Sequence, residues 1–402
     1  MVLSNNLMHL TIVTPFPPAI TGIGQYGYHV TRALAKSGAF SRVSVLAGSQ
    51  VNGETPNHLG LTEIEYCWQP GSLNARPAIL SRLKRLNPDL IWFNLGASIF
   101  GKSPWSNFSG ALTPMFAKQM GFPTVVTLHE LVEFADLRAL NAPGGPLAPV
   151  GARLLTTIAT YADVICLTMH HYKELLSTRR LDCRHIPIGA YHEPELLNES
   201  DSQELLFFTT LAPFKGLELL IEAFCKLRKK YPCLKLNIAG AEHTRFLNYT
   251  RELKTRFNGI DGIRWLGQIP EEQVINLFRE SQIVVLPYTA STGSSSVLYQ
   301  AATWGRAVVA SDLQEICTLA SENNLQIEFF NSGNAGSLCT SIQSLLDSCM
   351  KRRLQAEHNF RSILPTRPQE TGKQYIRAFN RALEKRNSTK RILIPEFQSE
   401  AG

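Results

Sequence analysis

Residues 283–311 read IVVLPYTASTGSSSVLYQAATWGRAVVAS. The apolar, β-branched run Ile283–Leu286 is typical of a strand buried on both faces, and Pro287 ends it. The small residues that follow allow a tight turn, and serine is a preferred N-cap for a helix over 297–304. Gly305 suits the position after a helix, and 307–310 supplies the next strand. The stretch therefore predicts a strand–turn–helix–strand unit of a parallel α/β sheet.

The turn in this unit is a candidate anion site. Free N–H groups at a helix N-terminus, behind a glycine and serine turn, favour a phosphate or diphosphate. An ordinary α/β turn with no ligand is the alternative. The candidate phosphate-binding residues are Gly293, Ser294, Ser295, Ser296 and Val297.

Length and composition indicate a globular protein of two domains. The chain has 402 residues, which exceeds one typical hydrophobic core, and 44% of them are hydrophobic against 18% charged. Eight cysteines are scattered without a Cys-x-x-Cys pair, which favours reduced thiols over a zinc site or a disulfide framework. Residues 1–6 lack a basic region leading into a signal-type core, so we expect no secretion.

The N-terminal segment predicts a second ligand-binding turn. Strand residues His9–Thr14 precede Thr21-Gly-Ile-Gly24, and a helix is expected from about Gln25 to Lys36. Gly22 and Gly24 would then lie at a strand-to-helix turn, where parallel sheets bind ligands. A plain tight turn is the alternative. The full Gly-x-Gly-x-x-Gly spacing with a downstream acid is absent, so a dinucleotide site is weakly supported.

Two further positions carry candidate chemistry. The strand Thr124–Leu128 ends at His129-Glu130, on the edge where side chains point into the crevice of a parallel sheet. His129 is therefore a candidate ligand contact, with a structural histidine as the alternative. Lys215 precedes Gly216 and a helix over 217–230, and a solvated lysine is one interpretation of this position.

These motifs resemble those of the retaining GT-B glycosyltransferases, glycosyltransferase family 4 in particular. The Lys215-Gly216 pair before Leu-Glu-Leu-Leu-Ile-Glu-Ala-Phe is the most specific match. The chain departs from the family pattern at three positions. Gln300 stands where the family has the second glutamate of its sugar-nucleotide motif, Thr292 stands at the first, and Thr210 replaces an arginine.

The resemblance implies an α/β GT-B fold of two doubly wound, Rossmann-like domains facing a cleft. It implies an N-terminal acceptor-side domain over 1–190, a nucleotide-sugar domain over 191–367, and a crossover helix with a tail over 368–402. The implied reaction moves a hexose, with retention, from a UDP- or GDP-linked donor to a hydroxyl of a saccharide or lipid-linked acceptor in polysaccharide or glycoconjugate biosynthesis. The resemblance implies that His129 contacts the transferred sugar and that Gln300 binds the ribose. It implies that Lys215, Thr210 and residues 292–297 bind the diphosphate and sugar of the donor. Gly22 and Gly24 would lie beside the donor phosphates.

No cofactor or metal is expected, because Asp-x-Asp is absent and a lysine with a helix end can neutralise the leaving group. The net charge of +7 comes without a nucleic-acid recognition motif. It favours anionic donors or peripheral contact with a membrane. The basic helix expected over 78–86 is a candidate for such contact, with a solvated helix face as the alternative. The apolar loop 133–151 is a candidate acceptor or membrane loop, with a passive connection as the alternative. We expect a cytoplasmic protein, with peripheral contact at the inner membrane surface as an open alternative. Two other functions also stay open, a catalytically inactive partner of another transferase and a different nucleotide-sugar enzyme such as an epimerase.

Overall fold

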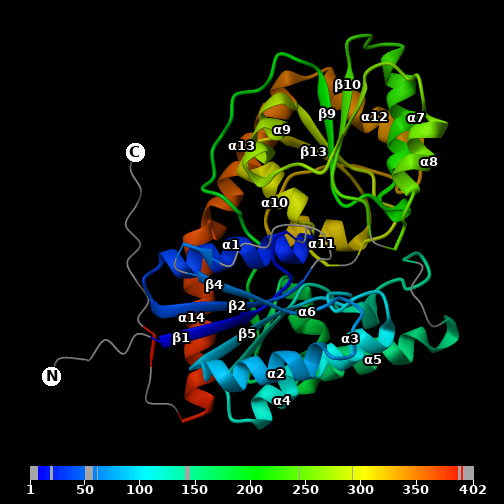
Figure 1. The fold of residues 1–402 in the computed structure, drawn as a ribbon. Coiled ribbons are helices and arrows are strands. Elements are labelled where there is room, and N and C mark those ends of the chain that lie inside the picture. The colour runs from blue at the N-terminus through cyan, green and yellow to red at the C-terminus, as the bar shows by residue number, and fades with distance from the viewer. Residues whose placement is uncertain are drawn as a thin grey trace. The chain divides into compact units, whose positions relative to one another are not determined.

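The computed structural model describes residues 8–18, 21–49, 58–60, 62–140, 145–243, 245–291, 293–387 and 391–392. Two compact units result (Figure 1). The first comprises residues 1–135, 142–188 and 368–402, and the second comprises 136–141 and 189–367. The N-terminal segment 1–6 and position 292, for which the sequence led to predictions, lie outside the described residues.

The first unit is built on an eight-stranded sheet of order β3-β4-β2-β1-β5-β6-β7-β8, in which only the short β3 pairs antiparallel. The central strands are buried on both faces, as a parallel sheet with helices on either side requires. The strands are β1 Met8–Val13, β2 Phe40–Gly48, β3 His58–Leu59, β4 Thr62–Trp68, β5 Leu90–Leu95, β6 Thr124–Leu128, β7 Val164–Leu167 and β8 Cys183–His185.

Helices cover both faces of this sheet. Helix α14 packs on α1, β6 and β7, while α2, α3, α4 and α5 pack among themselves (Figure 1). The helices are α1 Gly22–Lys36, α2 Ala75–Leu86, α3 Pro104–Ala111, α4 Thr113–Gln119, α5 Ala148–Ala159, α6 His170–Leu175 and α14 Pro368–Lys385, with 3-10 turns η1 Val132–Phe134, η2 Gly145–Leu147 and η3 Ser177–Arg179.

The second unit is a fully parallel sheet of order β11-β10-β9-β12-β13-β14. Its strands are β9 Glu204–Phe208, β10 Lys235–Ala239, β11 Ile263–Gly267, β12 Ile283–Leu286, β13 Ala307–Ser311 and β14 Glu328–Phe330. Its helices are α7 Leu217–Arg228, α8 Tyr249–Arg256, α9 Val274–Glu280, α10 Ser296–Thr303, α11 Gln314–Glu322, α12 Ala335–Leu346 and α13 Cys349–Ile363, with η4 Pro213–Lys215, η5 Glu271–Gln273 and η6 Leu364–Thr366. The prediction of two doubly wound parallel-sheet units is confirmed.

Two sequence predictions about where helices begin were wrong. Helix α1 begins at Gly22, not near Gln25, because the Thr21 hydroxyl caps it by accepting from the Gly24 N–H at 2.9 Å. Helix α2 begins at Ala75 instead of Ala78. In the second unit, α12 and α13 are separate helices, because the Ser348 hydroxyl accepts from Lys351 N and starts α13.

The terminal helix α14 is part of the core of the first unit. Its Tyr375 is fully buried, and the hydroxyl lies 2.7 Å from that of Tyr26 on α1 and 2.8 Å from that of Thr127 on β6. Arg381 pairs with Asp182 at 2.8 Å on the same unit. None of the helices among the described residues combines the length and apolar character needed to cross a bilayer.

Candidate functional site

The strand order places the two predicted loops of the second unit side by side. Strand β9 has β10 on one side and β12 on the other, so the connections after β9 and β12 leave in opposite directions. A parallel sheet binds ligands outside the carboxyl ends of its strands at such a switch point. The loop after β9 carries Thr210 and Lys215, and the loop after β12 leads into α10.

Backbone hydrogen bonds join these two loops. The carbonyl of Phe214 accepts from the N–H groups of Thr289 at 3.0 Å and Ala290 at 3.3 Å. Gly216 has φ +69°, and a Cβ built there would lie 1.8 Å from the carbonyl oxygen of Pro287. Only glycine meets both conditions, since other residues rarely adopt this φ and none fits the space. The lysine loop is thereby held against the end of β12.

The side chain of Lys215 is held by an aromatic ring. Its Nζ lies 3.7 Å from the centroid of the buried Tyr288 ring and 5.7 Å from that of Phe214. A cation over an aromatic face is attracted by the ring quadrupole. None of the ion pairs among the described residues involves Lys215. Its charge is therefore positioned without being neutralised by a carboxylate.

Helix α10 begins after the turn that follows β12, and residues 294–296 at its start are partly exposed. The N-cap residue is Ser295, so the prediction of a serine at this position is confirmed, although its side chain makes no capping bond and the helix spans 296–303. Gly293 adopts φ +70° in the turn before it. The Ser296 hydroxyl interacts with Tyr191, whose burial raises its pKa well above the usual range. Because no side chain of a described residue caps α10, its first N–H groups are candidates for an acceptor from outside the helix.

Three more predicted residues belong to the second unit. Gln300 lies on α10 and is nearly buried, and its side-chain amide forms no hydrogen bond with a described residue. Thr210 lies between β9 and η4, partly buried. Thr292 lies outside the described residues. The structure therefore brings Lys215, Ser294–Val297 and Gln300 to one edge of the second sheet.

In the first unit, His129 follows β6 and joins a buried polar network. Its Nε2 lies 2.6 Å from Oδ1 of Asn94, the penultimate residue of β5. Nδ2 of Asn94 donates to Oγ1 of Thr14 and to the carbonyl of Ile23, both at 2.9 Å. Because these two donations orient the amide, its oxygen faces His129 and accepts the Nε2 hydrogen. The Nδ1 atom of His129 is consequently the acceptor nitrogen.

His129 is neutral over the ordinary range of pH. Only 7% of it is exposed, and burial lowers its pKa to about 3. The ring of Tyr26 on α1 packs edge-on against it, with centroids 4.7 Å apart. Gly24 and Gly22 lie in the first turn of that same helix, at the carboxyl end of β1. These residues meet at the switch point between β1 and β5.

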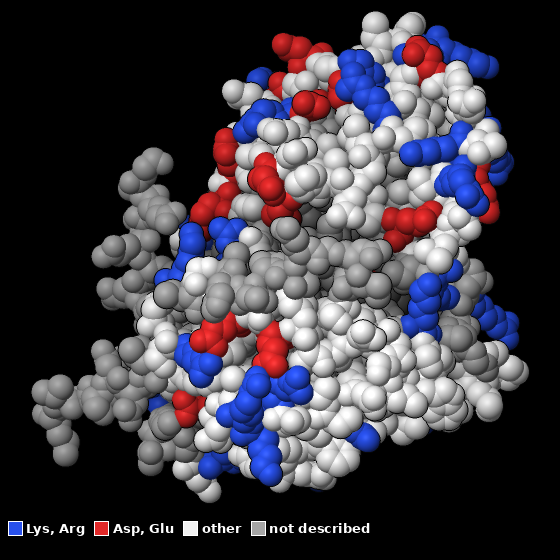
Figure 2. Space-filling model, in the orientation of Figure 1, with Lys and Arg blue, Asp and Glu red and all other residues white. Residues whose placement is uncertain are grey.

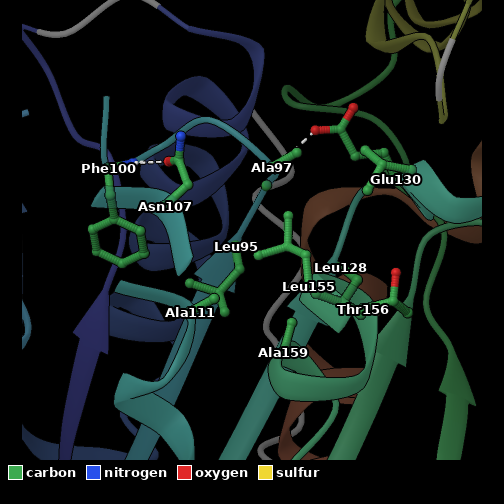
Figure 3. A pocket seen from close by; sticks show the side chains of 12 residues that line it. Leu95, Ala97, Phe100, Asn107, Ala111, Leu128, Glu130, Leu155, Thr156 and Ala159 are labelled. Atoms are coloured by element: carbon green, nitrogen blue, oxygen red, sulfur yellow. Dashed lines mark hydrogen bonds between the residues drawn. The ribbon is translucent and has the colours of Figure 1, made fainter. Parts of the chain in front are cut away.

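Glu130 lines a narrow pocket beside this network, with a volume of about 30 Å³ (Figure 3). One carboxylate oxygen of Glu130 accepts from the backbone N–H of Ala97 at 2.9 Å. The rest of the lining is largely apolar and comes from the ends of β5 and β6, the loop between β5 and α3, and helices α3 and α5, namely Leu95, Phe100, Ala111, Leu128, Leu155 and Ala159.

Sequence reasoning missed Asn94, Tyr26 and Tyr288 as parts of these sites. A polar asparagine in the otherwise apolar strand 90–95 was the one signal available for Asn94. Nothing in the sequence connects Tyr26 to His129 or Tyr288 to Lys215, because both contacts depend on strand order.

Two family models match the chain. Residues 21–188 match the model described as "Glycosyl transferase 4-like domain", and residues 202–348 match "Glycosyl transferases group 1". Together they cover well over half of the chain and fall separately on the two units. Solved structures with the same fold include sucrose-phosphate synthase from Thermosynechococcus elongatus, with a TM-score of 0.72 at 15% identity over 94% of this chain and 100% of that one.

A second similar structure is Anabaena HepE in complex with UDP and glucose, with a TM-score of 0.68 at 17% identity over 92% of this chain and 98% of that one. At these identities the likeness shows the GT-B fold alone. Among curated proteins, one component of human phosphatidylinositol N-acetylglucosaminyltransferase is 23% identical over 62% of the chain. A phosphatidyl-myo-inositol mannosyltransferase of Propionibacterium freudenreichii subsp. shermanii is 26% identical over 36%. The matches span 50% of the human relative and 34% of the bacterial one.

Proposed function

Because the chain belongs to the glycosyltransferases that combine a 4-like domain with a group 1 domain, we propose that it uses a nucleotide diphosphate sugar as donor. The sugar is transferred to a hydroxyl of a saccharide or lipid-linked acceptor. One observation carries the donor assignment. Lys215 and the start of α10 belong to two loops that hydrogen-bond to each other at the carboxyl edge of the second sheet.

The leaving diphosphate poses the main chemical problem. Negative charge grows on it as the bond between the anomeric carbon and the phosphate oxygen breaks. The Lys215 ammonium, the N–H groups of Ser296 and Val297 and the dipole of α10 would stabilise this charge. Losing one such preorganised donor costs roughly 3 kcal/mol of barrier. The arrangement would do this without a metal ion.

Gln300 is assigned to the ribose hydroxyls of the donor. Its amide is nearly buried on α10 and is not bonded to any described residue. An amide can both donate to and accept from a hydroxyl, whereas the glutamate of the family pattern accepts only. The UDP and glucose named in the complex of the similar Anabaena structure support testing UDP-linked donors first, with GDP-linked donors second.

His129 is assigned to binding the transferred sugar, not to moving a proton. With its pKa near 3 and Nε2–H committed to Asn94, the ring offers Nδ1 as a hydrogen-bond acceptor for a sugar hydroxyl. A base with so low a pKa is a poor proton acceptor at neutral pH. Retention of anomeric configuration follows from the family resemblance, and NMR of the product anomer would test it.

The names of the two curated relatives support a lipid-linked acceptor, since both refer to phosphatidylinositol species. A role in glycoconjugate or polysaccharide biosynthesis is consistent with such acceptors. The acceptor hydroxyl would be bound by the first unit, where Glu130 accepts from the Ala97 N–H and lines the apolar pocket.

A thermal-shift panel with UDP, GDP, ADP and TDP tests the donor site. A ligand at one hundred times its Kd stabilises a protein by about 2.7 kcal/mol. We expect one nucleotide to raise the melting temperature of the wild type and of Lys229→Ala, a surface lysine on the same unit, but not of Lys215→Ala. An equal shift in Lys215→Ala would contradict the assignment.

Gln300 also favours a second candidate function, that of a catalytically inactive partner of another transferase, because it replaces a motif carboxylate. Such a partner would release no nucleotide from any donor, with or without acceptors. The proposed transferase releases the nucleotide only when an acceptor hydroxyl takes the sugar. An epimerase would instead change the sugar with no acceptor present, which product analysis detects.

A further inference from the structure

The outer surface of α3 and α5 in the first unit is unusually apolar. Helix α3 packs on α5, and α5 packs on η1. Trp105 is 76% exposed, Leu147 74% and Val150 68%, and two neighbours are about half exposed. We call this set the apolar face, made up of Trp105, Phe134, Leu147, Val150 and Leu154.

Helix α5 carries large apolar residues on both its sides, although the exposed Arg153 and Thr157 also lie on it. Its inner side, with Leu155 and Ala159, lines the pocket of Figure 3. On its outer side lie Val150 and Leu154, and Leu147 lies just before the helix; the three residues are spaced three and four positions apart. A helix on the surface of a water-soluble domain normally turns a polar side outward. An apolar outer side therefore indicates a partner that removes it from water.

The charge around the apolar face identifies the kind of partner. The chain contains no aspartate or glutamate between residues 90 and 129, nor between 137 and 162. Phe134 lies outside these stretches, between Glu133, which pairs with Arg179 at 2.7 Å, and the exposed Asp136. The same stretches contain the exposed bases Lys102, beside α3, and Arg153, on α5. Among the described residues, Figure 2 shows no acidic side chain over α3 and α5. An apolar centre with basic surroundings is complementary to a negatively charged lipid surface.

We propose that the apolar face docks on the surface of an anionic phospholipid bilayer. The side chains of Trp105, Leu147, Val150 and Leu154 enter the boundary between head groups and acyl chains, where tryptophan is favoured. Lys102 and Arg153 remain at the level of the lipid phosphates. A second copy of the chain fits less well, because pairing this face with itself would bring Lys102 and Arg153 of both copies together, and the sequence stretches that carry them supply no acid to offset them.

The basic helix α2, which the sequence analysis offered for membrane contact, is a weaker candidate. Arg82 and Arg85 both pair with Glu65 on β4, at 2.9 and 2.5 Å. Arg76 lies over the ring of Phe116, 4.9 Å from its centroid. The Glu65 carboxylate offsets part of the charge of α2, and no large exposed apolar side chain lies on this helix. The sequence stretches that carry Trp105, Leu147, Val150 and Leu154 combine such side chains with bases and contain no acid.

Vesicle co-sedimentation tests the proposal on the full chain. The probes are vesicles of phosphatidylcholine alone and of equal parts phosphatidylcholine and phosphatidylglycerol. We expect the wild type to bind the anionic vesicles at least about tenfold more tightly than the neutral ones, as a few basic contacts provide. A variant carrying Trp105→Ser, Leu147→Ser, Val150→Ser and Leu154→Ser should lose this binding. The pair Lys102→Glu and Arg153→Glu should lose the preference for anionic lipid.

The matched control changes exposed leucines elsewhere, Leu247→Ser with Leu354→Ser, and should bind like the wild type. Thermal melts confirm that each variant folds. Trp105 is the most exposed tryptophan of the chain. Brominated lipids should therefore quench the tryptophan fluorescence of the wild type but not that of Trp105→Phe. Equal binding of the four-residue variant and the wild type would overturn the proposal. A second outcome would also overturn the proposal: the wild type binds no vesicles, and it forms a concentration-dependent dimer that only the four-residue variant abolishes.

Discussion

The Nζ atom of Lys215 lies 3.7 Å from the centroid of the Tyr288 ring, at the point where the loop after β9 meets the loop after β12. The ring holds the ammonium without cancelling its charge, as a carboxylate would. This relationship makes Tyr288 a positioning residue for Lys215 and leads to the first prediction.

Replacing Tyr288 by leucine should weaken donor binding while the phenylalanine variant should not. A cation over an aromatic ring contributes about 0.5–2 kcal/mol, which corresponds to roughly twofold to thirtyfold in affinity. Titration of the nucleoside diphosphate selected by the thermal-shift panel would measure the effect. If Tyr288→Phe loses as much affinity as Tyr288→Leu, the hydroxyl and not the ring matters, and the positioning role is wrong.

Gly216→Ala should disrupt the second unit more than an ordinary glycine substitution. The added methyl would lie 1.8 Å from the Pro287 carbonyl oxygen, at φ +69°. We expect a loss of at least about 3 kcal/mol of unfolding free energy, since backbone strain and steric overlap add. Gly259→Ala is the control, because it has φ +78° with no atom near the added methyl, and it should cost about 1 kcal/mol. If urea denaturation gives equal losses of unfolding free energy for the two variants, the backbone at Pro287 moves to make room for the added methyl.

Tyr375→Phe should destabilise the first unit by about 1–3 kcal/mol, because it leaves the buried hydroxyls of Tyr26 and Thr127 each without one partner. The exposed Tyr161→Phe serves as control and should be near neutral. Thermal melting of both variants measures the difference. No change in Tyr375→Phe would mean that the remaining hydroxyls find new partners.

Protonation of His129 should lower the free energy of unfolding of the protein as the pH falls. The pKa of His129 is about 3 in the folded protein against 6.5 in its ordinary state, so the unfolded chain binds more protons between these values. Stability therefore rises with pH through that window, by up to about 1.4 kcal/mol per pH unit. Above the ordinary pKa the contribution is complete and constant.

The matched variant for this pH dependence is His129→Gln, which keeps a donor for Asn94 but does not titrate. Between neutral pH and one to two units below the ordinary histidine pKa, the wild type should lose about 2 kcal/mol more than the variant. Denaturant titrations at the two pH values measure both. Parallel losses would mean that His129 is more accessible to protonation than its burial implies.

Local patterns were sufficient for the elements of the candidate site. The β-branched run at 283–286, the helix after Ser295 and Gly305 at φ +59° were each predicted, because strand burial, helix termination and glycine conformations depend on neighbouring residues. The family resemblance added the fold, which the structure confirms. The roles of His129, Lys215 and Gln300 stay predictions.

Local sequence patterns could not predict the order of the strands in the two sheets. Pairing of β9 with β12 brings Lys215 to Tyr288 across more than seventy residues, and pairing of β5 with β6 brings Asn94 to His129. Burial then sets the charge of His129, since a solvent-exposed histidine at the same place would titrate near its ordinary pKa. A residue's type and spacing thus identify the chemistry it can offer, whereas its partners and its protonation depend on which distant segments pack around it.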